Sequence, residues 1–390
     1  MKIARAIPVL SGGAAAVLVM TAAAPALASP GRVGHSRSAG HTRITATLRS
    51  GDTTTGVRGS GGSGVVLTGS TLTSSGSQVA FLFRGRLARA AGASVSLLRP
   101  PFRQVTSSTF YGPNTHLFNP RAIPRGDIRA VGSYVSSAAP QGVKNQGMLY
   151  LGPLSGRGGS WRSIDVPAYG RHVTGHVRAC PRSRRHCFVM DTIAHSTMGN
   201  LVVGNYDLNP TVRGGLASGN GFIYNIITRQ WTLLRMHGSL STKTSLYGIW
   251  QDGGPGSPHY TLAGGSSARG LQRGFLINYN ERTGTFGRPA FYVNNNRPTA
   301  ITHFDGITAV RGGFNLVSVS NGHSPALVFI PVRGRFFGRA RWFPVNVAGS
   351  AVCPCQAVTG NTVWRNNIMG LYIPNSSPVP HTYLATVRGR

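Results

Sequence analysis

Acidic residues, the usual general acids and bases of enzymes, are scarce in this sequence. The eight acids are Asp52, Asp127, Asp165, Asp191, Asp207, Asp252, Glu281 and Asp305. Several stand in turn sequences, such as Gln-Asp-Gly-Gly at Asp252 and Asn-Glu-Arg-Thr-Gly at Glu281. Asp305 differs, because it follows His303 by two positions and residues two apart in a strand point to the same side. If the protein is an enzyme, we expect His303 and Asp305 to be its catalytic residues; the other interpretation is a hydrogen-bonded strand end.

The common catalytic and cofactor-binding motifs are absent from the sequence. No Gly-x-Ser-x-Gly elbow, His-Glu-x-x-His helix or phosphate-binding loop appears. Paired-carboxylate chemistry needs two acids that converge on one bond, and few acids are available for it. We therefore favour a non-catalytic protein without a cofactor, and an extracellular hydrolase or lyase stays the alternative.

A set of aromatic, imidazole and carboxylate side chains could instead form a ligand-binding surface. The candidates are Tyr111, His195, Tyr247, Trp250, Asp305 and Trp364. Aromatic rings stack on sugars or bases, and arginines nearby add cation–π contacts. The plainer interpretation of these rings is hairpin and core packing. We expect Trp161, Trp231 and Trp342 to pack between neighbouring structural repeats.

The charge is strongly positive and almost all of it is arginine. Lys and Arg number 40 against 8 acids, a net charge of +32, and the lysines are Lys2, Lys144 and Lys243. Arginine binds phosphate and carboxylate in a bidentate manner, so we expect electrostatic binding to an anionic polymer: a cell-wall phosphate polymer, an acidic polysaccharide or extracellular DNA. A purely compositional origin, in a GC-rich genome or an acidic habitat, is the alternative. No motif for specific nucleic-acid recognition is present.

Four cysteines predict disulfides in an oxidising compartment. Cys180 and Cys187 flank the basic segment Pro-Arg-Ser-Arg-Arg-His in an insert at 169–187, and a bridge between them would close the base of that segment. Cys353 and Cys355 are separated by one residue, so either they pair with each other under strain or they pair with the cysteines of the insert. Metal binding is the third reading of this spacing, and we expect no metal site because clustered ligands are missing. The insert could also contact a protein partner, which makes an interaction scaffold a further functional alternative.

The strands that must position these residues are predicted from a sequence pattern that occurs six times along the chain. Runs of apolar, aromatic and β-branched residues bounded by Gly, Asn and Pro predict strands in pairs. The second strand of each repeat is predicted at 64–71, 128–135, 201–206, 260–267, 315–320 and 367–372. The third strand is predicted at 79–83, 147–151, 221–225, 274–278, 326–330 and 381–386.

Each second strand is preceded by a small residue next to an aliphatic or similar one. These triplets are Thr55-Gly56-Val57, Tyr111-Gly112-Pro113, Ile193-Ala194-His195, Tyr247-Gly248-Ile249, Asp305-Gly306-Ile307 and Gln356-Ala357-Val358. They predict innermost strands, where crowded backbones favour small side chains. Fourth strands are predicted in five repeats, at 95–99, 161–166, 231–236, 289–293 and 342–345.

The sixth repeat lacks a fourth strand, whereas a spare strand at 43–48 precedes the first repeat. If strand 43–48 completes the last sheet, the chain closes on itself and leaves no open sheet edge. The sequence therefore predicts an all-β fold, a β-propeller of six four-stranded blades that occupies 42–390 as a single domain. A β-sandwich pair or an open β-solenoid would leave the early strand unexplained.

The succession Tyr-Gly-Ile, Leu-Val-Val-Gly-Asn-Tyr, Gly-Phe-Ile-Tyr-Asn and Trp-Thr-Leu-Leu resembles the HAF-type repeats of bacterial secreted proteins. The resemblance covers Tyr111 to Tyr292 well and the rest of the chain loosely. It implies an exported, repeat-built protein with propeller-like blades. The family offers no catalytic residues to carry over to this chain.

The N-terminal segment predicts export. Residues 1–28 combine Lys2 and Arg5, an apolar stretch and a small-residue cleavage pattern, which is typical of a signal peptide, and 29–41 reads as a flexible basic leader. Loss of Lys2 and Arg5 leaves a net charge of about +30. No other apolar run approaches membrane-spanning length. We expect a secreted monomer that is extracellular or held on the cell wall by contacts alone.

Overall fold

The computed structural model describes residues 42–48, 50–87, 95–169, 173–174, 179–180, 186–209, 219–236, 243–268, 271–294, 302–320, 323–347 and 355–388. Two compact units divide the chain, Met1–Ser38 and Ala39–Arg390, and the described residues belong to the second. The predicted signal peptide and leader, and the centre of the insert at 169–187, lie outside the described residues. No helix in the described part is long and apolar enough to span a membrane.

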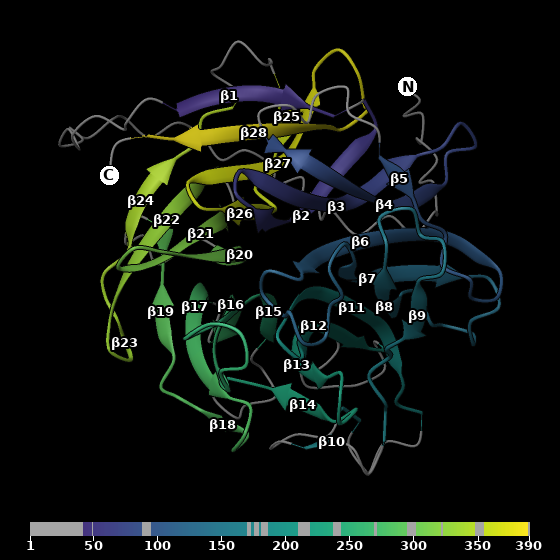
Figure 1. Cartoon of the computed structure of the whole chain (residues 1–390), viewed down its shortest axis with the longest axis horizontal. Helices are drawn as coiled ribbons and strands as arrows, with labels where there is room; N and C mark the ends of the chain where they lie inside the picture. Colours follow the sequence, from purple (N-terminus) through teal and green to yellow (C-terminus); the bar gives the residue numbers. More distant parts are fainter. Residues whose placement is uncertain are drawn as a thin grey trace, which may run out of the picture. The chain divides into compact units, whose positions relative to one another are not determined.

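The described chain is all-β, as predicted, and consists of antiparallel four-stranded repeats (Figure 1). The first strands are β2 (Asp52–Gly61), β6 (Val105–Thr115), β11 (Val189–Met198), β15 (Lys243–Gln251), β20 (Thr302–Val310), and β25 (Cys355–Val358) with β26 (Thr362–Trp364). The second strands are β3 (Gly64–Leu72), β7 (Ile128–Ser136), β12 (Leu201–Leu208), β16 (His259–Ala268), β21 (Gly313–Ser320) and β27 (Asn367–Pro374).

The outer strands complete each repeat. The third strands are β4 (Gln78–Arg86), β8 (Gln146–Gly152), β13 (Asn220–Asn225), β17 (Leu271–Asn280), β22 (His323–Arg333) and β28 (His381–Val387). The fourth strands are β5 (Ser96–Leu97), β9 (Ser160–Ser163), β14 (Trp231–Leu234), β19 (Ala290–Tyr292), β24 (Arg341–Pro344) and β1 (Thr42–Thr47). Short additional strands are β10 (Val173–Thr174), β18 (Thr285–Phe286) and β23 (Phe336–Phe337).

The early strand pairs where the sequence predicts it. β1 runs antiparallel to β28, with Arg43 opposite Thr386 and Thr47 opposite Thr382, so residues from the two ends of the described chain share one sheet. Hydrogen bonding gives five sheets rather than six, because a single parallel pair, Asn220 with Thr244, joins the third and fourth repeats into one ten-stranded sheet.

The hydrophobic core is divided into six clusters, and each lies between two consecutive repeats. The cluster of Val57, Phe81, Met369 and Leu384 packs the first repeat against the sixth. The predicted packing tryptophans belong to clusters between repeats: Trp231 is buried in one, and Trp161 and Trp342 are partly buried against two others. Their ring contacts with Phe222, Phe110 and Phe304 lie within their own repeats. Apolar burial thus links the last repeat back to the first.

First strands contact one another in a cyclic order. β2 contacts β6, β6 contacts β11, β11 contacts β15, β15 contacts β20, β20 contacts β26, and β26 contacts β2. Side chains satisfy carbonyl groups across these contacts: Thr55 Oγ1 donates to Phe110 O, and Asn361 Nδ2 donates to Thr54 O. A first strand is a sheet edge, and these bonds cap groups that pairing leaves open.

Candidate functional site

A β-bulge interrupts the first strand in each of the first five repeats. The register skips one residue at Thr55, Tyr111, His195, Tyr247 and Asp305. A bulge turns the extra side chain away from the sheet and is frequent next to functional sites. In four predicted triplets the bulge falls on the first residue: Thr55, Tyr111, Tyr247 and Asp305. In the third repeat it falls on His195, the last residue of the predicted triplet, so the prediction was two positions early there.

The bulge residues meet around a small cavity. Its volume is about 20 Å³, and all six first strands contribute to its lining, among them Tyr111, His195, Tyr247 and Asp305. In the sixth repeat the lining residues are Thr362 and Val363 of β26, so the predicted inner triplet 356–358 does not reach the cavity. The ring centroids of Tyr111 and His195 lie 4.9 Å apart, and those of His195 and Tyr247 4.6 Å apart.

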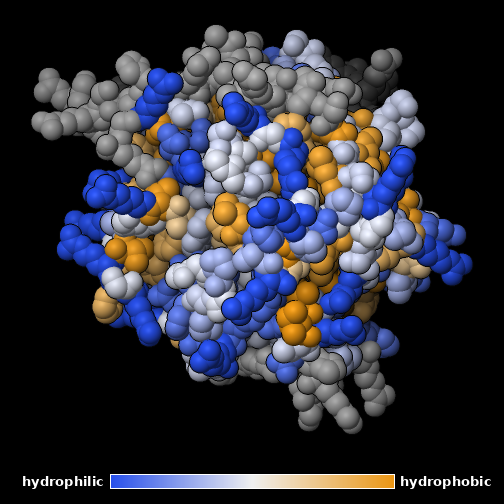
Figure 2. All heavy atoms as spheres, in the orientation of Figure 1, coloured by the Kyte–Doolittle hydropathy of each residue, from blue (hydrophilic) through white to orange (hydrophobic). Residues whose placement is uncertain are grey.

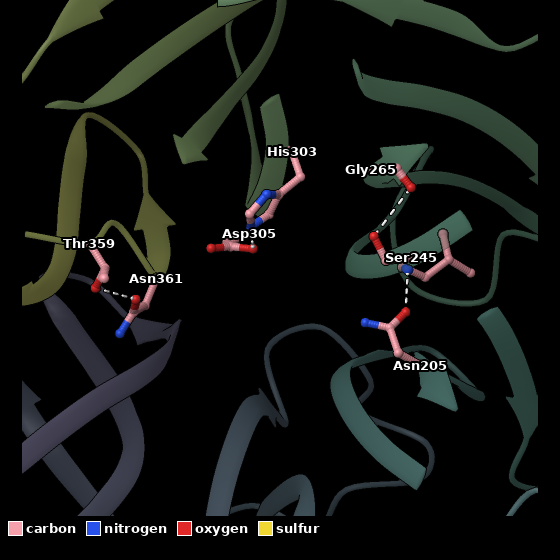
Figure 3. Close-up of polar contacts among 8 residues, drawn as sticks. Asn205, Ser245, Gly265, His303, Asp305, Thr359 and Asn361 are labelled. Carbon is pink, nitrogen blue, oxygen red and sulfur yellow. Dashed lines mark hydrogen bonds and ion pairs between the residues drawn. The ribbon is translucent and has the colours of Figure 1, made fainter. Parts of the chain in front are cut away.

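His303 and Asp305 form the predicted contact. His303 Nε2 lies 3.1 Å from Asp305 Oδ1, and the side chains are 30% and 18% exposed (Figure 3). Burial lowers the pKa of His303, but the charge and hydrogen bond of Asp305 outweigh it, so the pKa is raised. The His303 ring also packs on Tyr247, 5.2 Å between centroids.

Burial keeps the inner rings neutral. The pKa of His195 falls to about 3 through burial and through the charge of His303, and burial raises the pKa of Tyr111 to about 12. The pKa of Tyr247 is raised by burial and by Asp305. The environment of His303 therefore favours the protonated imidazolium, whereas that of His195 favours the neutral ring.

Trp250 and Trp364 do not line the cavity; they belong to an aromatic cluster with Phe118 that the sequence did not predict. Their rings both contact Phe118, and the guanidinium of Arg58 lies over Trp250, 5.4 Å from its centroid. Arg58 is buried and donates from Nε to Pro113 O at 3.3 Å and from Nη2 to Ser196 Oγ at 3.5 Å. Trp250 and Phe118 thus pack on a buried cation, and Trp364 joins the cluster through its contacts with these two rings.

Sequence reasoning missed three residues of this region: Thr55, Arg58 and Asn361. The repeat contains a signal for Thr55, because it precedes Gly56 as Tyr111 precedes Gly112. Asn361 is hidden because β25 and β26 break the pattern of the sixth first strand. Arg58 is one arginine among many, and its burial depends on tertiary contacts.

A second feature is an arginine in the turns at one end of every repeat. In each repeat, the turn from the first to the second strand and the turn from the third to the fourth strand lie at the same end of the sheet. We call this end the turn end. Exposed arginines at turn ends, and at the adjoining end of β4, are Arg86, Arg121, Arg125, Arg157, Arg229, Arg282, Arg311, Arg335 and Arg365. None of these nine arginines forms an ion pair with a described carboxylate.

Hydrogen bonds between repeats place the turn ends side by side. They join Arg84 to Asp127 O, Asn119 to Gly199 O, Asn225 to Glu281, Asn278 to Arg335 O and Asn315 to Arg365 O, from each repeat to the next. The arginines therefore share one side of the described unit. Figure 2 shows hydrophilic side chains spread among smaller hydrophobic patches on the face in view.

A groove of about 880 Å³ opens between the fourth and fifth repeats. Arg288, Arg335 and the 81% exposed Phe336 lie along it, with Asp252 at one wall. Thr261 Oγ1 donates to Asp252 Oδ2 at 2.8 Å, and burial raises the pKa of this carboxyl to about 6. Glu281, also read as a turn residue, accepts from Tyr260 and Asn225.

The cysteines agree in part with the predicted bridges. Cys180 and Cys187 are disulfide-bonded, with Cα atoms 5.7 Å apart, and close the base of the basic segment between them as predicted. This excludes their pairing with Cys353 or Cys355. Cys355 is also disulfide-bonded, and Cys353 lies outside the described residues. Among the described residues, no group of three or more His, Cys, Asp or Glu side chains could hold a metal ion.

Comparison with known proteins yields no family. No family model matches the chain, and no curated protein matches it. The chain is similar to the Hadza microbial sialidase Hz136, with a TM-score of 0.47, 10% identity, and coverage of 85% of this chain and 65% of that one. It is similar to a post-proline cleaving enzyme from Rickettsia typhi, with a TM-score of 0.35, 7% identity, and coverage of 81% of this chain and 40% of that one. Likenesses at this level assign this chain neither a fold nor an activity.

Proposed function

We propose that the protein is a secreted, non-catalytic binding module that holds an anionic polymer on its turn ends. The observation that carries the proposal is the presence of exposed, unpaired arginines at this end in all six repeats. Unpaired guanidinium groups are free to bind phosphate, sulfate or carboxylate groups in a bidentate manner. Neutralisation of several polymer charges at once releases counterions and gives strong binding that weakens steeply with salt.

The scaffold of this proposal is a six-bladed β-propeller closed by β1. The cyclic contacts of the first strands, the core cluster between the first and sixth repeats, and the pairing of β1 with β28 support it. In such a scaffold each blade presents its turn end on the same side, so the arginines form one extended surface. The resemblance of the repeats to HAF-type sequences and the signal-like segment 1–28 support an exported protein.

The groove between the fourth and fifth repeats favours an acidic polysaccharide among the candidate polymers. Exposed Phe336 offers a face for a sugar ring, and Arg288 and Arg335 offer cations for its acidic groups. Half-buried Asp252 and buried Thr261 line the groove with polar atoms of the kind that fix hydroxyl groups in binding sites.

The proposal is tested by binding of the secreted chain to heparin, poly(glycerol phosphate) and duplex DNA over a range of salt concentrations. Replacing Arg121, Arg125, Arg229 and Arg282 by Gln should weaken binding to the preferred polymer at least about tenfold and reduce the salt slope by up to about 4. Arg103→Gln with Lys144→Gln is the matched control, since both residues are exposed and lie beyond the opposite strand ends. Equal loss in both variants, or binding insensitive to salt, would contradict the proposal.

The alternative of a hydrolase or lyase depends on His303 and Asp305. A cavity of about 20 Å³ beside them admits a water-sized particle and not a sugar ring or a peptide bond. We therefore assign the pair a structural role. Substrate profiling of the unmodified chain and of the Asp305→Asn variant separates the structural role from the catalytic one. A hydrolytic activity that is present in the unmodified chain and lost in the variant would establish the enzyme.

A further inference from the structure

Arg58 presents an electrostatic problem that no side chain of the described chain resolves. The residue is 4% exposed, and it forms no ion pair with a described residue. Its hydrogen-bond acceptors are a carbonyl at 3.3 Å and a hydroxyl at 3.5 Å, both at the long end of the range. A buried charge is costly unless it is paired or fully hydrogen-bonded.

The surroundings of the guanidinium differ on its two sides. The rings of Trp250 and Phe118 lie 5.4 and 5.9 Å from its central carbon and supply cation–π contacts without a negative charge. Arg58 and Ser196 also line the cavity of about 20 Å³ between the first strands. This volume suits a single water or a monoatomic ion, and it is too small for a phosphate or sulfate group.

We propose that Arg58 and Ser196 hold one chloride ion in this cavity. The guanidinium supplies the charge, and the Ser196 hydroxyl supplies a second donor when it turns its proton toward the ion. Asp305, the carboxylate on the same lining, is engaged with His303 and does not pair with Arg58. The ion is a structural ligand that joins β2 to β11 across the first strands, separate from the polymer site on the turn ends.

A ligand that binds the folded chain alone stabilises it by mass action. The test is thermal unfolding of the secreted chain in sodium chloride and in sodium gluconate at the same ionic strength, since gluconate is too large for the cavity. We expect the unfolding temperature to rise with chloride by roughly 2 °C for each tenfold increase above the dissociation constant. Bromide should replace chloride, and its anomalous signal should lie beside the Arg58 guanidinium.

Arg58→Met should abolish the difference between the two salts and leave polymer binding unchanged. Ser196→Ala, which tests the site if the Met variant does not fold, should reduce the response, and Arg103→Gln should keep it. Equal unfolding temperatures of the unmodified chain in both salts, or bromide found at surface arginines alone, would overturn the proposal. Because polymer binding is measured separately, either proposal can fail without the other.

Discussion

At the scale of single residues, His195 is a histidine whose pKa burial strongly lowers. Its folded pKa of about 3 lies below the ordinary value of 6.5, so between these values the unfolded chain takes up a proton that the folded chain does not. Stability is therefore complete above pH 6.5 and is lost as the pH falls toward 3. Replacement by Gln should reduce the loss of unfolding free energy between pH 7 and pH 5 by about 2 kcal/mol, measured by urea denaturation.

His303 provides the opposite sign as a control. Its pKa is raised by Asp305, so its contribution to stability is present below the unfolded pKa and is lost as the pH rises through the folded one. His303→Gln should therefore steepen the loss of stability on acidification, whereas His195→Gln should flatten it. Identical pH profiles of the two variants would show that neither ring has a shifted pKa in the folded chain.

At the scale of elements, glycine faces the bulge from the neighbouring second strand in the first four repeats. Gly264 pairs with Leu246 at the bulge of Tyr247, and a Cβ there would overlap the carbonyl oxygen of Ser245. Ser318 occupies this position in the fifth repeat, with its Oγ buried and without a hydrogen-bond partner. Gly264→Ala should cost about 1–3 kcal/mol, whereas Ser318→Ala should be neutral or stabilising in denaturant titrations. A neutral Gly264→Ala would mean that the bulge shifts freely.

The elements themselves follow closely from the sequence, and the site follows in part. Alternation, β-branched residues and turn signals locate the second and third strands, because these depend on local pattern. The same repeat reveals Tyr111, His195, Tyr247 and Asp305, since a bulge repeats with the strand that contains it. The environment of Arg58 is not predictable in this way: Trp250 and Phe118 reach it from other repeats, and only the folded chain brings them together.

At the scale of the whole molecule, a missing strand at one end and a spare strand at the other predict the pairing of β1 with β28. The third and fourth repeats are linked by a single pair, Asn220 with Thr244. The sequence contains no signal for this pair, because it depends on how closely the two sheets approach each other in the folded chain. The shared side of the turn-end arginines depends on how all six repeats are oriented, which no single repeat encodes.

The pairing of β1 with β28 makes the stability of the whole unit depend on six residues. A secreted chain that begins at 48 would expose the full edge of β28, whose pairing partners are Thr42 to Thr47. Unpaired edges of this length aggregate, and the sheet loses the burial that its fourth strand provides. We expect this truncation to lower the unfolding temperature by several degrees and to produce concentration-dependent aggregates in light scattering. A chain that begins at 42 is the control and should behave as the longer one; equal stability of both chains would show that the last sheet stands without its borrowed strand.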